Sequence, residues 1–398
     1  MLRTPDTSRG PPARMKRRRL KIAYLSDEPP GDRWSHSGGN ARILAALERH
    51  AGEVTVLPVH WFAAEPLRRA VQALPEALAI RVRWRLQLLA APLIARGLAR
   101  ELARDRFDVL FCSYAFQALA ALRTPYPLLR VFSSDATPSS FRRSALGERF
   151  GSYLSASRLL DPLIRRAEGR VLRGNDLNLW PSDWQKRQAD ALFSLAPECS
   201  LVVPWGANID TAPPPRDPAL PGPGEALELL FLGRDWEAKG GPLALQVLAR
   251  LNDGGTPARL TIIGCSPPEP LPAQTELHPF IDKTRPEGAA LLAALFGRAH
   301  FMLMPSFESY GFAFCEASAH GLPVLCLDVG GVPVTEGVNG FALPAGSSAD
   351  AFAGLIRRQI ADAGAYGALR ENARARYRRV LNWDAWGERV AGLLHARL

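Results

Sequence analysis

One segment of the sequence holds two carboxylates and a glycine around a predicted helix start. Residues 304–323 read MPSFESYGFAFCEASAHGLP, so Glu308 lies in a loop and Glu316 about one turn inside the helix that follows. Gly321 and Pro323 predict the end of that helix. The free backbone N–H groups and the dipole at its start favour a diphosphate. The two carboxylates can accept hydrogen bonds from the paired hydroxyl groups of a sugar or a ribose.

A second segment carries two cations at the predicted end of a strand. Residues 231–241 read FLGRDWEAKGG, which places Arg234 and Lys239 beside glycines. Arginine binds phosphate through parallel N–H groups, and lysine acts as a point charge. Solvated surface cations are the usual interpretation of such a pair, but the strand end and the glycines favour a phosphate site.

The first half of the chain offers two further candidates. Gly38 and Gly39 open a predicted helix after the first strand and would let a phosphate or a sugar approach the backbone. The pattern is not Gly-x-Gly-x-x-Gly and no acidic residue ends the next strand, so it does not favour NAD. Asp135, at another strand end, is a candidate for binding a sugar or acceptor hydroxyl; the alternative is a helix N-cap.

Apolar strands alternate with helical patterns along the chain, which is typical of parallel sheets. The alternation stops in a proline- and glycine-rich stretch and then restarts. We therefore predict an α/β protein of two facing Rossmann-like domains, with a C-terminal helical tail that can cross back to the first domain. Ligands of such sheets bind at the carboxyl ends of the strands, hence in a shared cleft. The expected parts are a basic disordered tail (1–19), an N-terminal domain (20–204), a hinge (205–224), a C-terminal domain (225–375) and a C-terminal helix (376–398).

The length, the apolar stretches and the cysteine spacing of the chain indicate which class of protein it belongs to. A chain of 398 residues is longer than one hydrophobic core usually grows. No apolar stretch reaches the roughly 20 residues of a membrane-spanning helix, and the N-terminus does not resemble an export signal, so we expect a cytoplasmic protein. The cysteines form no Cys-x-x-Cys pair, which favours buried thiols over a zinc site or disulfides; they are Cys112, Cys199, Cys265, Cys315 and Cys326.

Arginines and leucines interleave from Pro66 to Arg106, within a chain of net charge +10. Such a basic amphipathic stretch can lie on an anionic membrane surface, which would place the protein on the inner face of the membrane. The alternative is a pair of solvated surface helices. We expect no nucleic-acid partner.

Together these segments resemble the family 4 retaining glycosyltransferases, the glycosyl transferases group 1 of GT-B architecture. The resemblance rests on the Glu-x7-Glu segment and on the Arg234 and Lys239 loop, and it is densest from Leu227 to Gly346. It implies that the N-terminal domain binds the acceptor and the C-terminal domain the nucleotide-sugar donor. It also implies that Glu308 contacts the transferred sugar, and that Glu316 holds the ribose.

The resemblance further implies that the two cations neutralise the leaving diphosphate, so that no metal and no other cofactor is needed. The expected catalytic residues are Glu308, Asp135, Arg234 and Lys239. The expected donor-binding residues are Gly38, Gly39, Arg234, Lys239, Glu308, Ser309, Tyr310, Gly311, Phe312 and Glu316. Many family members have a histidine where this chain has Ser134 or Asp135, so no acid or base is assigned.

The expected function is metal-independent transfer of a sugar, with retention, from a nucleotide-sugar to a glycan or lipid-linked acceptor, as in cell-surface polysaccharide synthesis. Two alternatives share the fold. A nucleotide-sugar epimerase would need an acidic base at the strand ends of the first domain. A non-catalytic sugar-nucleotide binding protein would not need both glutamates and both cations.

Overall fold

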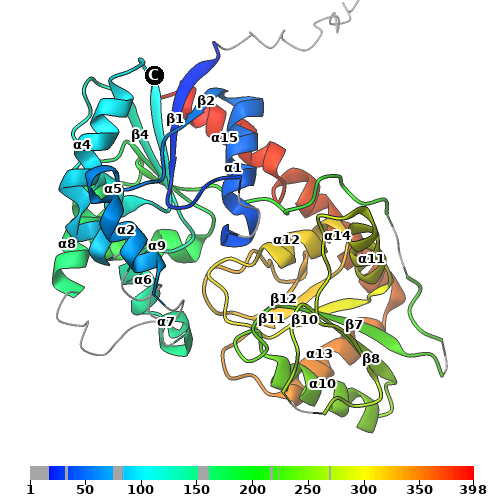
Figure 1. Cartoon of the computed structure of the whole chain (residues 1–398). Coiled ribbons are helices and arrows are strands. Elements are labelled where there is room, and N and C mark those ends of the chain that lie inside the picture. Colours follow the sequence, from blue (N-terminus) through cyan, green and yellow to red (C-terminus); the bar gives the residue numbers. More distant parts are fainter. Residues whose placement is uncertain are drawn as a thin grey trace, which may run out of the picture.

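The structure is a computed structural model that describes residues 18–31, 35–74, 83, 85–150, 161–215, 218–222, 224–268 and 270–398, with 148–150 described by their backbone. It contains two parallel sheets, each covered by helices, and the expected two Rossmann-like domains are confirmed (Figure 1). Of the expected basic tail, residues 1–17 lie outside the described part. Arg19 donates a hydrogen bond to the carbonyl of Gly52 (2.9 Å), which ties the start of the first strand to its neighbour.

The first sheet has the strand order β2-β1-β3-β4-β5-β6. Successive residues of β1 enter two separate cores: Ile22 and Tyr24 pack on one face, and Ala23 and Leu25 on the other. This burial on both faces explains the continuous apolar strands of the sequence. The strands are β1 (Leu20–Ser26), β2 (Gly52–Val56), β3 (Val109–Ser113), β4 (Leu129–Ser133), β5 (Leu177–Trp180) and β6 (Ser200–Val202). The helices are η1 (Ser35–Gly38), α1 (Gly39–His50), η2 (Phe62–Ala64), α2 (Glu65–Gln72), α4 (Ala91–Leu102), α5 (Phe116–Leu119), α6 (Pro138–Arg142), α7 (Ala145–Phe150), α8 (Asp161–Arg173) and α9 (Asp183–Phe193).

The second sheet has the strand order β12-β11-β10-β7-β8-β9, which is the Rossmann order. Its strands are β7 (Leu227–Leu232), β8 (Ala258–Ile263), β9 (Thr275–His278), β10 (Phe301–Met304), β11 (Val324–Leu327) and β12 (Gly340–Leu343). Its helices are α10 (Gly241–Asp253), α11 (Pro286–Arg298), α12 (Phe312–Ala319), α13 (Ala349–Ile360) and α14 (Ala363–Arg379), followed by α15 (Trp383–His395). The two edge strands β9 and β12 were not predicted, because each is short and partly exposed.

Each sheet has one point at which the strand order reverses. In the first sheet it lies between β1 and β3, and in the second between β7 and β10. The loops after these strands leave in opposite directions and open a crevice, which is where doubly wound sheets bind their ligands.

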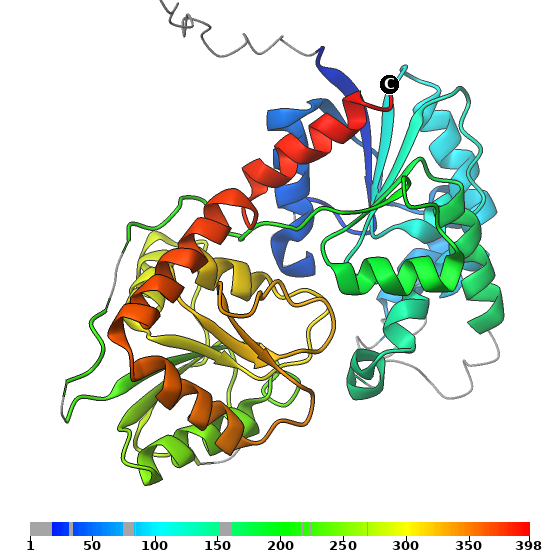
Figure 2. The same ribbon diagram turned by 180° about the vertical axis from the view of Figure 1, so that it is seen from behind.

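The C-terminal helix crosses back to the first domain, as expected. Figure 2 shows α15 running from the second domain to the side of α1. Trp386, Val390 and Leu394 are buried in one core with Ile43 and Leu47 of α1. This tail therefore belongs to the first domain by packing, although it follows the second in sequence.

Replacement of Trp386 by alanine should lower the free energy of unfolding by about 3–5 kcal/mol, the usual cost of removing a buried tryptophan. The side chain is 1% exposed and meets Phe111 edge to face. Urea unfolding measures the change. The control is Arg389→Ala, at an exposed position of the same helix, which should change it by less than about 0.5 kcal/mol. Equal stability of both variants would show that α15 is not held by this core.

Candidate functional site

A cavity of about 420 Å³ lies between the two domains, at the carboxyl ends of the strands that flank both points of reversal. Its walls carry most of the residues that the sequence singled out. From the first domain come His36, Ser37, Tyr114 and Asp135, and from the second Arg234, Lys239, Glu308, Ser309, Tyr310, Gly311, Phe312 and Glu316. The topology thus unites segments that lie far apart in the sequence.

Lys239 and Glu308 face each other in this cavity. The Nζ of Lys239 lies 2.5 Å from the Oε1 of Glu308. Gly240 makes the approach possible, because its φ is +79° and a Cβ there would lie 2.1 Å from the carbonyl oxygen of Pro305. The two side chains neutralise each other here, so a bound diphosphate would compete with Glu308 for the ammonium group. Arg234 is exposed at the same wall.

The loop between Glu308 and α12 lines the cavity, and its aromatic side chains contact the hinge between the domains. Gly311 precedes α12 with φ +93°, a conformation that suits glycine. The hydroxyl group of Tyr310 donates to the carbonyl of Trp205 (2.7 Å), and the ring of Phe312 stacks on that of Trp205 at 5.5 Å. Within the first turn of α12, the N–H of Phe314 donates to the carbonyl of Gly311 (3.1 Å), and the start of a helix is in general suited to bind an anion.

Glu316 lies between the 420 Å³ cavity and a second one of about 490 Å³ beside the hinge. Its side chain is buried, with 8% of the residue exposed. Burial raises the pKa of this carboxyl group, while the charges of Lys283 and Arg42 oppose the rise. A carboxylate with nearby cations and little water is suited to accept hydrogen bonds from paired hydroxyl groups.

Asp135 bridges the two domains. Its Oδ2 accepts a hydrogen bond from the hydroxyl group of Ser309 (2.5 Å). It is not the cap of the next helix, because Thr137 accepts from the backbone N–H of Ser140 and caps α6. Burial raises the pKa of Asp135, and the Ser309 bond and the charge of His36 oppose that rise.

The two glycines of the first domain differ in position. Gly38, with φ +83°, lines the cavity beside the hinge. A Cβ on Gly39 would lie 3.0 Å from the ring of Phe312, so this glycine lets the two domains approach. Donor binding by either stays a prediction.

His36 and Tyr114 were not predicted from the sequence as site residues. Both line the 420 Å³ cavity, and their rings stack at 3.9 Å. They follow β1 and β3, and only the strand order makes them neighbours. A histidine directly before the Ser37–Gly39 turn was the one local signal.

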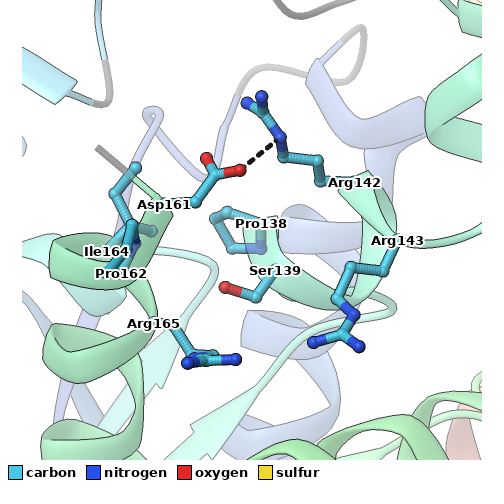
Figure 3. Close-up of a pocket in the computed structure, with 8 residues that line it drawn as sticks. All are labelled: Pro138, Ser139, Arg142, Arg143, Asp161, Pro162, Ile164 and Arg165. Carbon is cyan, nitrogen blue, oxygen red and sulfur yellow. Dashed lines mark ion pairs between the residues drawn. The ribbon is translucent and has the colours of Figure 1, made fainter. Parts of the chain in front are cut away.

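A third cavity, of about 290 Å³, lies within the first domain between α6 and α8 (Figure 3). Asp161 pairs there with the Nε of Arg142 at 2.8 Å. Its described lining contains none of the predicted site residues, so we assign the functional site to the cavity between the domains.

The described residues show neither a metal-binding group nor a membrane-spanning helix. Across the described ranges, no three His, Cys, Asp or Glu residues gather as a metal-binding group would require. None of the helices in the described part of the chain is long and apolar enough to cross a bilayer. All five cysteines are free, and four are buried.

Part of the chain is similar to a known family of glycosyltransferases. Residues 226–362 match the family model "Glycosyl transferases group 1". The D-inositol 3-phosphate glycosyltransferase of Streptomyces avermitilis is 32% identical over 50% of this chain and 47% of its own length. The one from Streptomyces griseus subsp. griseus is 30% identical over 70% of this chain and 64% of its own length. The chain thus spans about half to two thirds of these relatives.

Solved structures share the fold of the whole chain. A glycosyltransferase from Rickettsia africae has a TM-score of 0.61 at 13% identity, covering 95% of this chain and 98% of the other. Anabaena HepE in complex with UDP and glucose has a TM-score of 0.60 at 16% identity, covering 95% and 100%. At such low identity these likenesses establish the fold alone, which is that of GT-B glycosyltransferases.

Proposed function

We propose that this chain, whose residues 226–362 match the glycosyl transferases group 1 family, transfers a sugar with retention of configuration from a nucleotide-sugar donor bound between its domains. The observation that carries the proposal is the 420 Å³ cavity, in which Lys239, Glu308 and the start of α12 converge. Cations and helix amides suit a diphosphate, and a buried carboxylate beside them suits a sugar.

In the proposed reaction, the bond between the anomeric carbon and the phosphate oxygen breaks, and the oxygen of the acceptor hydroxyl group bonds to that carbon from the same face. The proton of that hydroxyl group passes to the departing phosphate oxygen. Negative charge grows on the departing diphosphate. Arg234, Lys239 and the N–H groups at the start of α12 would meet this charge. Fixed donors aimed at developing charge are usually the largest contribution of an enzyme to the rate.

Two binding roles complete the proposal. Glu308 would hold the transferred sugar and Glu316 the ribose, because the first lies beside Lys239 and the second nearer the hinge. We propose a glycan or a lipid-linked molecule as acceptor, entering from the first-domain wall near Asp135. The curated relatives are named for D-inositol 3-phosphate, which makes this compound the first acceptor to test.

The two alternatives are less well supported. An epimerase would need an acidic base at the first-domain wall, and Asp135 is already engaged by Ser309. A binding protein without activity would use the same cations to hold the diphosphate, so formation of product is the property that separates it from an enzyme. Formation of a glycosylated product from donor and acceptor excludes both.

Replacement of Arg234 or of Lys239 by alanine should lower turnover roughly 100- to 1000-fold, because removal of one donor to developing charge has this effect in other enzymes. Initial rates at saturating donor measure it. The control is Arg259→Ala, an exposed arginine at the opposite end of the second sheet, which should keep the wild-type rate. Wild-type turnover in both site variants would remove the cations from the reaction.

Turnover should survive excess EDTA, since we propose that side chains and helix amides take the place of a metal at the diphosphate. The assay compares rates after dialysis against EDTA with rates after added Mg²⁺ or Mn²⁺. Loss of activity that either ion restores would contradict the metal-independent mechanism.

We propose that the face around α4 docks on anionic lipid. Leu89 and Leu93 are 69% and 41% exposed, and Arg96 and Arg100 are exposed on the same side of the helix by their spacing. Of the predicted amphipathic stretch, residues 75–82 and 84 lie outside the described part. Apolar side chains beside arginines suit a membrane surface.

Vesicles containing anionic lipid should therefore sediment the protein at low salt, and salt should release it, because each basic residue near the surface contributes about 1 kcal/mol of screened attraction. Leu89→Ser with Leu93→Ser should abolish sedimentation. The control is Leu291→Ser, at a position of the second domain that is also 41% exposed. Equal sedimentation with neutral vesicles would end the proposal.

A further inference from the structure

We infer that His36, held by Asp27, binds a hydroxyl group of a sugar at the transfer site. The inference rests on the proposed glycosyltransferase function and assigns it a residue on the wall opposite Lys239 and Glu308. Its evidence comes from topology, from the contacts of the ring, from the backbone and from charge.

Topology places His36 at the ligand-binding edge of the first sheet. Asp27 and His36 lie in the loop after β1, and Tyr114 follows β3 directly, so they flank the point at which the strand order reverses. The corresponding point of the second sheet carries Lys239 and Glu308. Both crevices open on the same 420 Å³ cavity.

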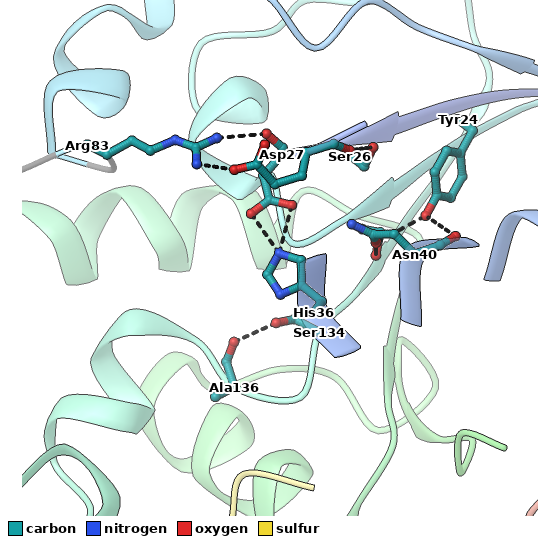
Figure 4. Close-up of polar contacts among 10 residues, drawn as sticks. Tyr24, Ser26, Asp27, His36, Asn40, Arg83, Ser134 and Ala136 are labelled. Atoms are coloured by element: carbon teal, nitrogen blue, oxygen red, sulfur yellow. Dashed lines mark hydrogen bonds and ion pairs between the residues drawn. The ribbon is translucent and has the colours of Figure 1, made fainter. Parts of the chain in front are cut away.

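The contacts of the His36 imidazole hold the plane of the ring and engage one of its two nitrogen atoms. Its Nε2 lies 3.1 and 3.0 Å from the two carboxylate oxygens of Asp27 (Figure 4). Its ring stacks on that of Tyr114 with centroids 3.9 Å apart and planes 12° apart. With Nε2 engaged, Nδ1 is the nitrogen left for a ligand, and 28% of the side chain is exposed.

Arg83 in turn contacts the segment that carries Asp27. Arg83 donates to the carbonyl oxygen of Asp27 at 2.9 Å and pairs with the carboxylate of Glu28. Arg83 thus holds the backbone of Asp27. A carboxylate that orients a histidine from a fixed segment is a common arrangement for a ring that must meet a substrate in one orientation.

The backbone around His36 adopts a conformation that side chains rarely accept. His36 and Ser37 have φ values of +46° and +54°, and Tyr114 has +62°. The amide of Asn208 in the hinge donates to the carbonyl of Ser37 (2.7 Å) and holds the turn. Such outliers persist where the surrounding structure enforces them, and they cluster at ligand sites.

The charges around the ring favour a polar ligand. Burial opposes the charged imidazole, but the hydrogen bond and charge of Asp27, with Asp135 and Glu28 beyond it, raise the pKa of His36. The positive charge of Arg83 offsets the negative charge of Glu28, with which it forms an ion pair. The Nδ1 group can donate to a hydroxyl oxygen when it is protonated, and can accept from a hydroxyl group when it is not.

The test separates sugar from nucleotide. UDP, GDP and ADP and their glucose conjugates are titrated calorimetrically into wild type, His36→Gln and Asp27→Asn. The control is His278→Gln, which removes a histidine that also pairs with a carboxylate, Glu276 at 2.7 Å, but on the edge strand β9. In His36→Gln, the affinity for the diphosphate that wild type binds best should change less than about twofold, and that for its glucose conjugate should fall about tenfold.

Two further measurements, the acceptor KM and the pH dependence of affinity, complete the test. If conjugate affinity is kept but the KM for D-inositol 3-phosphate rises about tenfold, the hydroxyl group belongs to the acceptor, which still supports the inference. In Asp27→Asn, the pH at which the affected affinity changes should move down, because Asp27 raises the pKa of His36. A packing role alone would not move it.

Unchanged conjugate affinity and unchanged acceptor KM in His36→Gln would overturn the inference while the proposed function stands. If wild type binds no nucleoside diphosphate, the proposed function fails and the inference falls with it.

Discussion

A single tryptophan in the hinge contacts both walls of the site. Trp205 is fully buried, and its ring stacks on Phe312 while its carbonyl oxygen accepts from Tyr310. Its ring centroid lies 5.9 Å from that of Tyr114, on the first-domain wall. One side chain therefore contacts the segment that carries the proposed sugar- and phosphate-binding groups and the segment that supports His36.

The chain crosses between the domains twice, once in the hinge and once before α15, and the two crossing segments contact each other. Beside Trp205, a Cβ on Gly206 would lie 2.4 Å from the backbone nitrogen of Trp383, so glycine lets the hinge pass against the start of α15. Ala207 donates to the carbonyl of Leu381 (3.0 Å), and the indole of Trp383 donates to the side chain of Asn208 (3.0 Å). Because Asn208 also holds Ser37, the C-terminal crossing supports the wall that bears His36.

The sequence predicted those parts of the site that depend on local structure. A strand, a loop with glycine and a capped helix can be recognised within twenty residues, so Glu308, Gly311 and Glu316 were placed correctly relative to one another. The same holds for Lys239 at the end of β7. What could not be predicted depends on strand order: the ion pair of Lys239 with Glu308 needs β7 beside β10.

Long-range packing also decided between the interpretations that the sequence left open. Asp135 could have capped a helix, but Thr137 does so, and Asp135 faces Ser309 instead. For His36 the sequence offers only its place before a glycine-rich turn, which indicates no partner until β1 and β3 are known to be neighbours.

The most direct test of the central claim is calorimetry with the nucleoside diphosphate, beside single-turnover rates, for Glu308→Gln and Glu316→Gln. We predict that Glu316→Gln weakens diphosphate affinity, because the partner of Glu316 is the ribose, which is present in donor and product alike. Glu308→Gln should keep that affinity and lower the single-turnover rate, because its partner is the departing sugar. Wild-type affinity and rate in both variants would contradict the account.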